Sequence, residues 1–447
     1  MSNANVSQAG DLVEVGEAPL VDQISTPQGD VLDGSVLYGS GIAGSGPEGS
    51  GPEGAGPEGA GPDGSAVQAL PALDFFDLTR EGLEKVLEER FALPKYRAQQ
   101  IFQWVYTRRV QSFAEMSNIA KPLRDLLAGG FLFPTPVIKE RQISSDGTRK
   151  YLFEVDGGDL VETVMIKQPN RMTLCVSSQV GCAMGCKFCR TATMGLKRQL
   201  RTSEIIQQVL GVIDDAKNFN DMFQNMVFMG MGEPLHNFEG VTNTLRILKD
   251  AAGLGMSGRK ITISSVGLVP AITAFGETGL DTNLAISLNA TDDETRSQIM
   301  PLNRKYPLEV LIECLRQFPL SKRKRITIEY VMLAGVNDRA EDLKRLPQLL
   351  RGIPVKMNLI PYNLNAGLGF DTPTREHIAH WQRELMRHGL ETTVRWSKGR
   401  DIDAACGQLV TDSRRKKLDR SEVATEPKIK SLATVPILDL PILDLPA

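Results

Sequence analysis

The sequence predicts an α/β fold, a partial (β/α)6 barrel preceded by a small helical domain and flanked by two disordered ends. Three observations support this prediction. Short β-rich runs alternate with helical stretches over residues 171–411, and apolar residues recur at helical spacing over 73–135. The two ends of the 447-residue chain have low-complexity sequence.

Both ends of the chain are expected to be disordered. Residues 1–72 contain ten acidic residues and no Lys or Arg, and a Gly-Pro-Glu-Gly-Ser type repeat begins at Gly46. Its period of five excludes collagen, and the composition buries too little apolar surface to offset chain entropy. Residues 412–447 are charged and then repeat Pro-Ile-Leu-Asp-Leu from Pro436. This tail is either a partner-docking motif or an inert appendage.

Composition sets the expected location and the charge of the folded part. No run of about 18 apolar residues is present to span a bilayer, and the start at Met1 lacks the basic and then apolar order of a secretion signal. We therefore expect a cytoplasmic protein. The net charge is −3, but beyond residue 72 the chain has 44 acidic and 51 basic residues, a net charge of +7. Such a charge suits a polyanionic partner, although many soluble domains carry it by chance.

Residues 73–135 are predicted to form a helical accessory domain, because the segments 81–87 and 96–106 place apolar residues on one face. Basic and aromatic residues are mixed there: Lys95, Arg97, Arg108 and Arg109 lie among Tyr96, Trp104 and Tyr106. This mixture either binds RNA backbone and stacks on bases or forms a solvated face over an aromatic core.

Residues 136–170 are expected to form a β-hairpin linker. Two β-rich runs, 149–155 and 160–166, are separated by the turn sequence Asp-Gly-Gly-Asp at 156–159. Glu162 lies on the second predicted strand.

Six parallel strands are predicted in the barrel, at 172–176, 226–229, 260–263, 283–287, 326–330 and 355–360. Helical stretches such as 203–210 and 380–386 lie between them. In folds of this kind the functional site lies at the C-terminal ends of the strands.

Cysteine spacing gives the strongest chemical signal. The six cysteines are Cys175, Cys182, Cys186, Cys189, Cys314 and Cys406. Four of them crowd into one short stretch of a large chain, which favours reduced thiols over a disulfide framework. Structural zinc takes four protein ligands, whereas three thiolates leave one iron of a cubane cluster free. The spacing Cys182-x3-Cys186-x2-Cys189 resembles the radical S-adenosylmethionine (SAM) superfamily, in which the free iron of a [4Fe-4S] cluster chelates SAM. Phe188 fits this pattern and would shield the cluster.

Polar residues at later strand ends match a SAM site. Gly232-Glu233 follows the second barrel strand and resembles the GGEP motif that holds the amino group of SAM. The other candidates are Ser264, Ser287, Leu288, Asn289 and Asn363. For any one of them taken singly, ordinary strand-end capping is the favoured explanation.

Several motifs in order resemble the RlmN-type adenine-C2 methyltransferases of 23S ribosomal RNA and transfer RNA. The matching segments are 161–163 (Val-Glu-Thr), 175–182, 231–234 (Met-Gly-Glu-Pro), 329–333, 335–338 (Gly-Val-Asn-Asp) and 401–409 (Asp-Ile-Asp-Ala-Ala-Cys-Gly-Gln-Leu). They span nearly the whole predicted fold. The resemblance implies methylation of an adenosine in the peptidyl-transferase region and of the adenosine 3′ to the anticodon.

The resemblance also implies a mechanism with two SAM molecules per turnover. One SAM methylates the Cys406 thiolate, a nucleophilic step that a thiol performs. The second is reduced at the cluster to a radical that takes hydrogen from this methyl group, and the methylene radical adds to C2. Glu162 matches the proton acceptor, and Cys175 forms a disulfide with Cys406 to release the product. Radical chemistry is needed because adenine C2 is electrophilic and cannot attack SAM itself.

One departure and two alternatives accompany this resemblance. The fourth-strand motif has Asn289 where the family has His. The first alternative is a Cfr-like enzyme, which methylates C8 of the same adenosine and uses the same two cysteines. The second alternative is a non-catalytic iron-sulfur RNA-binding protein, in which Cys175 and Cys406 would have no role. The implied partners are 23S rRNA, tRNA and an electron donor such as flavodoxin or ferredoxin, with no membrane, and the protein is expected to be a monomer. Cys314 is expected to pack in the core of its helix.

Overall fold

The structure is a computed structural model that describes residues 71–365 and 367–411. All of these residues belong to one unit, Gln68–Ala447. Disorder was predicted for 1–72 and 412–447, and all of these residues except 71 and 72 lie outside the described ranges.

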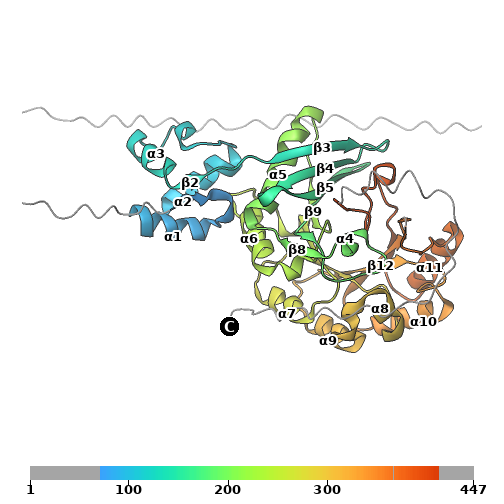
Figure 1. Cartoon of the computed structure of the whole chain (residues 1–447). Helices are drawn as coiled ribbons and strands as arrows, with labels where there is room; N and C mark the ends of the chain where they lie inside the picture. Colours follow the sequence, from blue (N-terminus) through green and yellow to red (C-terminus); the bar gives the residue numbers. More distant parts are fainter. Residues whose placement is uncertain (1–70, 366, 412–447) are drawn as a thin grey trace, which may run out of the picture. The chain divides into compact units, whose positions relative to one another are not determined.

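One mixed sheet of ten strands organises the barrel (Figure 1). The six predicted parallel strands are confirmed: β6 (Arg171–Cys175), β9 (Asn225–Phe228), β10 (Ile261–Ser265), β11 (Asn283–Ser287), β12 (Ile326–Met332) and β13 (Val355–Pro361). They lie side by side in chain order. A further parallel strand, β14 (Thr392–Val394), pairs with β13 and was not predicted, because it has three residues and little apolar character.

Helices connect the parallel strands and cover the outer face of the sheet (Figure 1). They are α5 (Thr202–Ala216), α6 (Phe238–Lys249), α7 (Val269–Glu277), α8 (Asp293–Ile299), α9 (Leu308–Gln317), α10 (Ala340–Leu349) and α11 (Arg375–Arg387). The helical stretches predicted at 203–210 and 380–386 lie within α5 and α11. No helix in the described ranges is long and apolar enough to cross a membrane.

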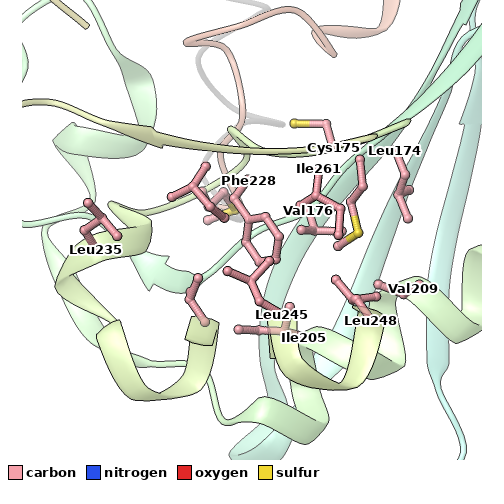
Figure 2. Packing of buried hydrophobic residues seen from close by; sticks show 14 of the residues in the cluster. Leu174, Cys175, Val176, Ile205, Val209, Phe228, Leu235, Leu245, Leu248 and Ile261 are labelled. Carbon is pink, nitrogen blue, oxygen red and sulfur yellow. The ribbon is translucent and has the colours of Figure 1, made fainter. Parts of the chain in front are cut away.

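The core packs α5 and α6 against β6, β9 and β10 (Figure 2). Leu174, Phe228 and Ile261 of the strands and Leu245 of α6 are at most 1% exposed. Each such burial contributes about 1.5–3 kcal/mol. Successive strand residues point to opposite faces, so Cys175, which follows Leu174, turns its sulfur away from the helices (Figure 2). The thiol therefore faces the inside of the barrel.

Three antiparallel strands extend the same sheet: β3 (Val137–Ile143), β4 (Arg149–Val155) and β5 (Asp159–Gln168). The hairpin β4–β5 is confirmed, and β5 pairs with β6, so this segment is a continuation of the barrel sheet. Strand β3 was not predicted, because its Lys139-Glu140-Arg141 centre gives no apolar alternation.

The N-terminal helices are also present: α1 (Arg80–Phe91), α2 (Tyr96–Phe102) with a π-helical turn (Gln103–Thr107), and α3 (Lys121–Ala128), beside the strand pair β1 (Leu73–Asp74) and β2 (Phe131–Leu132). Trp104 and Tyr106 are buried in an aromatic core and cannot stack on bases. Of the two interpretations of this segment, the aromatic core is therefore the one that applies to Trp104 and Tyr106. Tyr96 is 59% exposed, and Arg109 pairs with Asp214 of α5 at 2.6 Å.

Short elements complete the chain. The strands β7 (Gln179–Gly181) and β8 (Leu196–Gln199) form a small separate pair, and helix α4 is Arg190–Thr193. The 3-10 turns are Phe75–Asp77, Phe113–Glu115, Asp156–Gly158, Lys217–Phe219, Pro234–His236, Gly258–Lys260, Pro301–Arg304 and Arg400–Ile402.

Candidate active site

A cavity lies at the C-terminal ends of the parallel strands, as expected for this fold. It encloses about 1020 Å³ of space when its open mouth is included. The predicted residues that line it are Cys182, Cys186, Cys189, Gly232, Glu233, Ser264, Ser287, Asn289, Asn363 and Cys406. The structure thus brings together all but three of the predicted site residues. Cys175, Glu162 and Leu288 are absent from this lining.

The cluster loop, residues 182–189, is held by its own backbone and by the strand pair beside it. The Cys182 amide donates to the Gly195 carbonyl at 2.8 Å, and the Cys189 amide donates to the Cys186 carbonyl at 3.2 Å. The loop leaves all three thiols in the cavity wall. Among the described residues, no group of three or more His, Cys, Asp or Glu side chains is arranged to hold a single metal ion. Three thiols spread around a cavity suit a cluster, in which each thiolate binds a different iron.

Burial controls the charge state of the three thiols. It raises the pKa of Cys182 to about 12 and raises the pKa values of Cys186 and Cys189 as well. Thiolates in so apolar a place need a cationic partner, and iron supplies that charge. The donor set therefore fits an iron-sulfur cluster.

The Gly-Glu segment after β9 approaches the cavity through its backbone. Gly232 has a φ of 105°, and a Cβ there would lie 2.6 Å from Gln179 Cβ, so only glycine fits. Glu233 accepts hydrogen bonds from the amides of Val266 at 2.9 Å and Leu235 at 3.3 Å. Burial nevertheless raises its pKa to about 7. A buried carboxylate of this kind favours a cationic group such as an ammonium.

The remaining cavity residues supply polar groups at neighbouring strand ends. Ser264 Oγ donates to the Phe228 carbonyl at 2.6 Å, and Asn363 Nδ2 donates to the Cys406 carbonyl at 3.0 Å. Asn289 accepts from the Val331 amide at 2.7 Å. Leu288 is fully buried, so a contact with SAM would have to come from its backbone.

Glu329, on β12, lines the cavity and was not predicted as a site residue. Its Oε1 accepts from Asn358 at 3.0 Å, while its Oε2 is buried without a hydrogen-bond partner among the described residues. Burial raises its pKa. SAM carries hydroxyl, amino and ammonium donors, so this free acceptor also fits SAM.

Cys406 belongs to a long loop after β14, residues 395–411, which we call the Cys406 loop. The Gly407 carbonyl accepts from the Arg190 amide at 2.8 Å, and the Leu409 carbonyl accepts from Thr191 Oγ1 at 2.7 Å. These bonds tie the Cys406 loop to the chain that follows the cluster loop. The Cys406 thiol consequently lies in the same cavity as Cys189.

Cys175 and Cys406 line a second, smaller pocket together with Arg395. Both are free thiols. Burial raises the pKa of Cys175 to about 12, and negative charge on Cys406 raises that of Arg395 above its ordinary value. Arg395 also donates to Met229 Sδ at 3.5 Å. This arginine, missed because β14 was not predicted, is a cation that stabilises a thiolate at either sulfur.

Glu162 lies behind the Cys406 loop. Its Oε1 is 3.0 Å from Lys150 Nζ, and its Oε2 accepts from the Val410 amide at 2.8 Å. Both side chains of this ion pair are only 4% exposed. Glu162 therefore anchors one end of the Cys406 loop, and its role as proton acceptor stays a prediction.

The antiparallel strands anchor the other end of the same loop. Asp401 accepts from Ser144 Oγ at 2.5 Å and from the Ser145 amide at 2.9 Å. Asp146 accepts from the Gly399 amide at 2.9 Å. The β3–β4 turn and β5 thus fix a loop that lies some 250 residues further along the chain.

A partial parallel barrel with three thiols around a cavity at its strand ends defines a radical SAM enzyme, and the radical SAM superfamily model matches residues 176–346. The model for the ribosomal RNA large subunit methyltransferase N-terminal domain matches residues 73–131. The dual-specificity RNA methyltransferase RlmN of Geobacter sulfurreducens is 50% identical over 72% of this chain and 89% of its own length. That of Pelobacter propionicus is 44% identical over 79% of this chain and 99% of its own. The chain belongs to the RlmN family.

A solved structure supports the same assignment. A radical SAM methyltransferase from Sphaerobacter thermophilus superposes with a TM-score of 0.70 at 40% identity, covering 75% of this chain and 99% of the other. The barrel and the N-terminal helical domain predicted from the sequence are therefore those of a known methyltransferase architecture.

Proposed function

We propose that this protein methylates C2 of adenosine in the peptidyl-transferase region of 23S rRNA and in tRNA, 3′ to the anticodon, with the methyl group carried by Cys406. One observation carries this proposal beyond family membership. Cys406 lines the cavity that holds the three cluster thiols and also the pocket that holds Cys175. A thiol in that position can receive a group on one side and be attacked by a second thiol on the other.

The cavity residues divide into two sets. Cys182, Cys186 and Cys189 would hold a [4Fe-4S] cluster, which would supply the electron for reductive cleavage of SAM. Glu233 holds the SAM ammonium, and Gly232 lets the backbone approach it. The residues assigned to the rest of SAM are Ser264, Ser287, Leu288, Asn289 and Asn363.

The two remaining cysteines handle the methyl group. The Cys406 thiolate attacks the methyl of SAM, forming an S–CH3 bond and releasing S-adenosylhomocysteine. After this carbon has bonded to C2 of the RNA base, Cys175 attacks the sulfur of Cys406. The S–S bond forms, the bond from sulfur to the RNA-bound carbon breaks with its electron pair left on that carbon, and a proton completes the new methyl group. Arg395 stabilises thiolate charge at both sulfurs. Glu162 is assigned as the base that takes the C2 proton. A donor such as flavodoxin or ferredoxin would supply the electron for SAM cleavage, and two further electrons reduce the disulfide before the next turnover.

The N-terminal helical domain is assigned to RNA binding. Tyr96 is exposed with the Arg97 guanidinium 4.9 Å from its ring centroid, and Arg108 lies 4.2 Å from the centroid of Trp104. These cations are placed for phosphate contacts. We further propose that the protein works as a monomer in the cytoplasm, where both RNAs are found.

Two counts after anaerobic reconstitution test the proposal: iron per chain and methyl groups per Cys406. We expect four irons per chain, as the assigned cluster contains, and a methyl group on Cys406. Mass spectrometry of RNA from a deletion strain then locates the missing methyl group. Loss of 2-methyladenosine supports the proposal, whereas loss of 8-methyladenosine alone would assign the chain to C8 chemistry.

A further inference from the structure

A separate pocket adjoins the cluster cavity, and the function above does not use it. Tyr362 and Asn363 line both. The pocket is completed by Thr372 and Arg375 at the start of α11 and by Trp396 and Arg400 of the Cys406 loop. We call it the tryptophan pocket.

Its side chains have unused binding capacity. Trp396 is 47% exposed, with the Arg375 guanidinium 4.8 Å from its ring centroid. Arg375 and Arg400 are exposed, and neither has a carboxylate partner within the part of the chain that the structure describes. An open indole and two guanidinium groups without a carboxylate partner in the described residues form one cluster.

This chemistry selects the ligand. A nucleotide of single-stranded RNA presents a flat base for stacking, an anionic phosphate and sugar hydroxyls. No carboxylate side chain lines the pocket, so nothing there repels a phosphate. An acidic peptide would satisfy the two arginines but would leave the indole unused.

The position of the pocket identifies which nucleotide it would receive. Trp396 also lines the pocket that contains Cys175 and Cys406. A base stacked on Trp396 therefore lies beside the loop that delivers the methyl group. Turning the target base out of its stack, as base-modifying enzymes do, leaves its neighbours in need of a new stacking surface.

We propose that the tryptophan pocket binds the nucleotide adjacent to the target adenosine, with its base on Trp396 and its phosphate between Arg375 and Arg400. This proposal rests on the RNA methyltransferase function above. It makes Trp396 a positioning residue for the RNA.

The test uses reconstituted full-length protein and a tRNA transcript with 2-aminopurine next to the target adenosine. Stacking on Trp396 should quench the 2-aminopurine fluorescence on binding. W396A should lose this quench and raise the KM for RNA about tenfold, the contribution of one stacked base, with a smaller change in kcat. W396F should recover most of the affinity, because phenylalanine keeps a stacking face.

The arginines are tested by salt dependence. R375A/R400A should reduce the slope of log affinity against log salt by about one, the value for one lost phosphate contact. The matched control is R383A, which removes an exposed cation from the same helix outside the pocket. Iron content of each variant reports intact folding.

Each outcome is decisive. Wild-type protein that methylates RNA, with W396A and R375A/R400A matching R383A, overturns the pocket proposal and leaves the enzyme function intact. Wild-type protein that neither binds nor methylates either RNA overturns the function itself. Quench that persists in W396A would assign the stacking to another residue and also overturn the proposal.

Discussion

The cluster loop and the Cys406 loop meet at one cavity but are held in place in different ways. The cluster loop is fixed by nearby residues, such as the bond from the Cys182 amide to the Gly195 carbonyl. The Cys406 loop depends on Asp146, Ser144 and Glu162, which lie some 250 residues earlier in the chain. Local contacts thus build the cofactor site, and long-range contacts place the residue that carries the methyl group.

This difference separates two functions of the sheet. The parallel strands provide the cavity at their C-terminal ends. The antiparallel extension β3–β5 provides the anchors of the Cys406 loop. We therefore expect changes in the two loops to have separable effects on the cluster and on methyl transfer.

The largest expected effect comes from removing the two key thiols in turn. C406A should abolish RNA methylation, with activity at least about 1000-fold below wild type, because no other group can carry the methyl. It should still contain the full iron complement. C182A should lose both iron and activity, since one of the three cluster ligands is gone.

Iron content and RNA methylation measured on the same preparations check this prediction. C314S serves as the control, because Cys314 lies half-buried on α9 beside Thr273 and outside the cavity. Loss of iron in C406A would make Cys406 a cluster ligand and break the comparison between the loops.

The next largest effect is expected at Glu162. E162A leaves the buried Lys150 unpaired and removes the acceptor for the Val410 amide. We expect a loss of stability of about 3 kcal/mol and much less methyl on Cys406. E162Q keeps an acceptor for Val410 but cannot take a proton, so Cys406 should still be methylated while RNA product falls.

Mass spectrometry of Cys406 and of the RNA separates these steps. The control E162Q/K150M removes both charges and tests whether an unpaired lysine causes the defect. Normal RNA product from E162Q would assign the C2 proton to another base, and Glu162 would then act only as an anchor.

The sequence predicted the parts of this molecule that depend on short-range patterns. The six parallel strands follow from local periodicity, and the cluster spacing follows from three cysteines within one eight-residue segment, 182–189. Strand β14 was too short to detect, so Arg395, which follows it, was missed. The pairing of Glu162 with Lys150 follows from strand register, because β4 and β5 place Leu152 opposite Glu162 and bring Lys150 to the same region. No local pattern reveals that register or the loop it anchors.

A smaller effect is expected at Asp401. Hydrogen bonds from Ser144 and Ser145 lower its pKa to about 2. A lowered carboxyl pKa means that the anchor is complete above about pH 4 and is lost as the pH falls toward 2. D401N should reduce Cys406 methylation about threefold, which is the cost of weakening one exposed hydrogen-bonded anchor. Between pH 5 and 9 the anchor is fully charged, so the dependence of the rate on pH should be the same in D401N as in the wild type.

The rate of Cys406 methylation at pH 5, 7 and 9 measures this effect, with S144A as a partner variant. Because both changes weaken the same contact, D401N/S144A should be little worse than D401N alone. Fully additive losses would show that Asp401 acts through a different partner.

The smallest effect is expected at Asn289, the position where the resemblance leads us to expect His. Asn289 has a φ of 57°, a conformation that Asn and His both tolerate. Its Oδ1 accepts from the Val331 amide and its Nδ2 lies 3.2 Å from Met300 Sδ, so both polar atoms already bind the protein. An imidazole can replace only one of these two hydrogen bonds, so the substitution costs about one net hydrogen bond. N289H should therefore change the KM for SAM less than about threefold. N289V, which is strained at positive φ, should lose stability instead. A tenfold fall in KM for N289H would show that an imidazole at this position gives SAM a contact that Asn289 does not, and the cluster side of the cavity would then depend on more than its local loop.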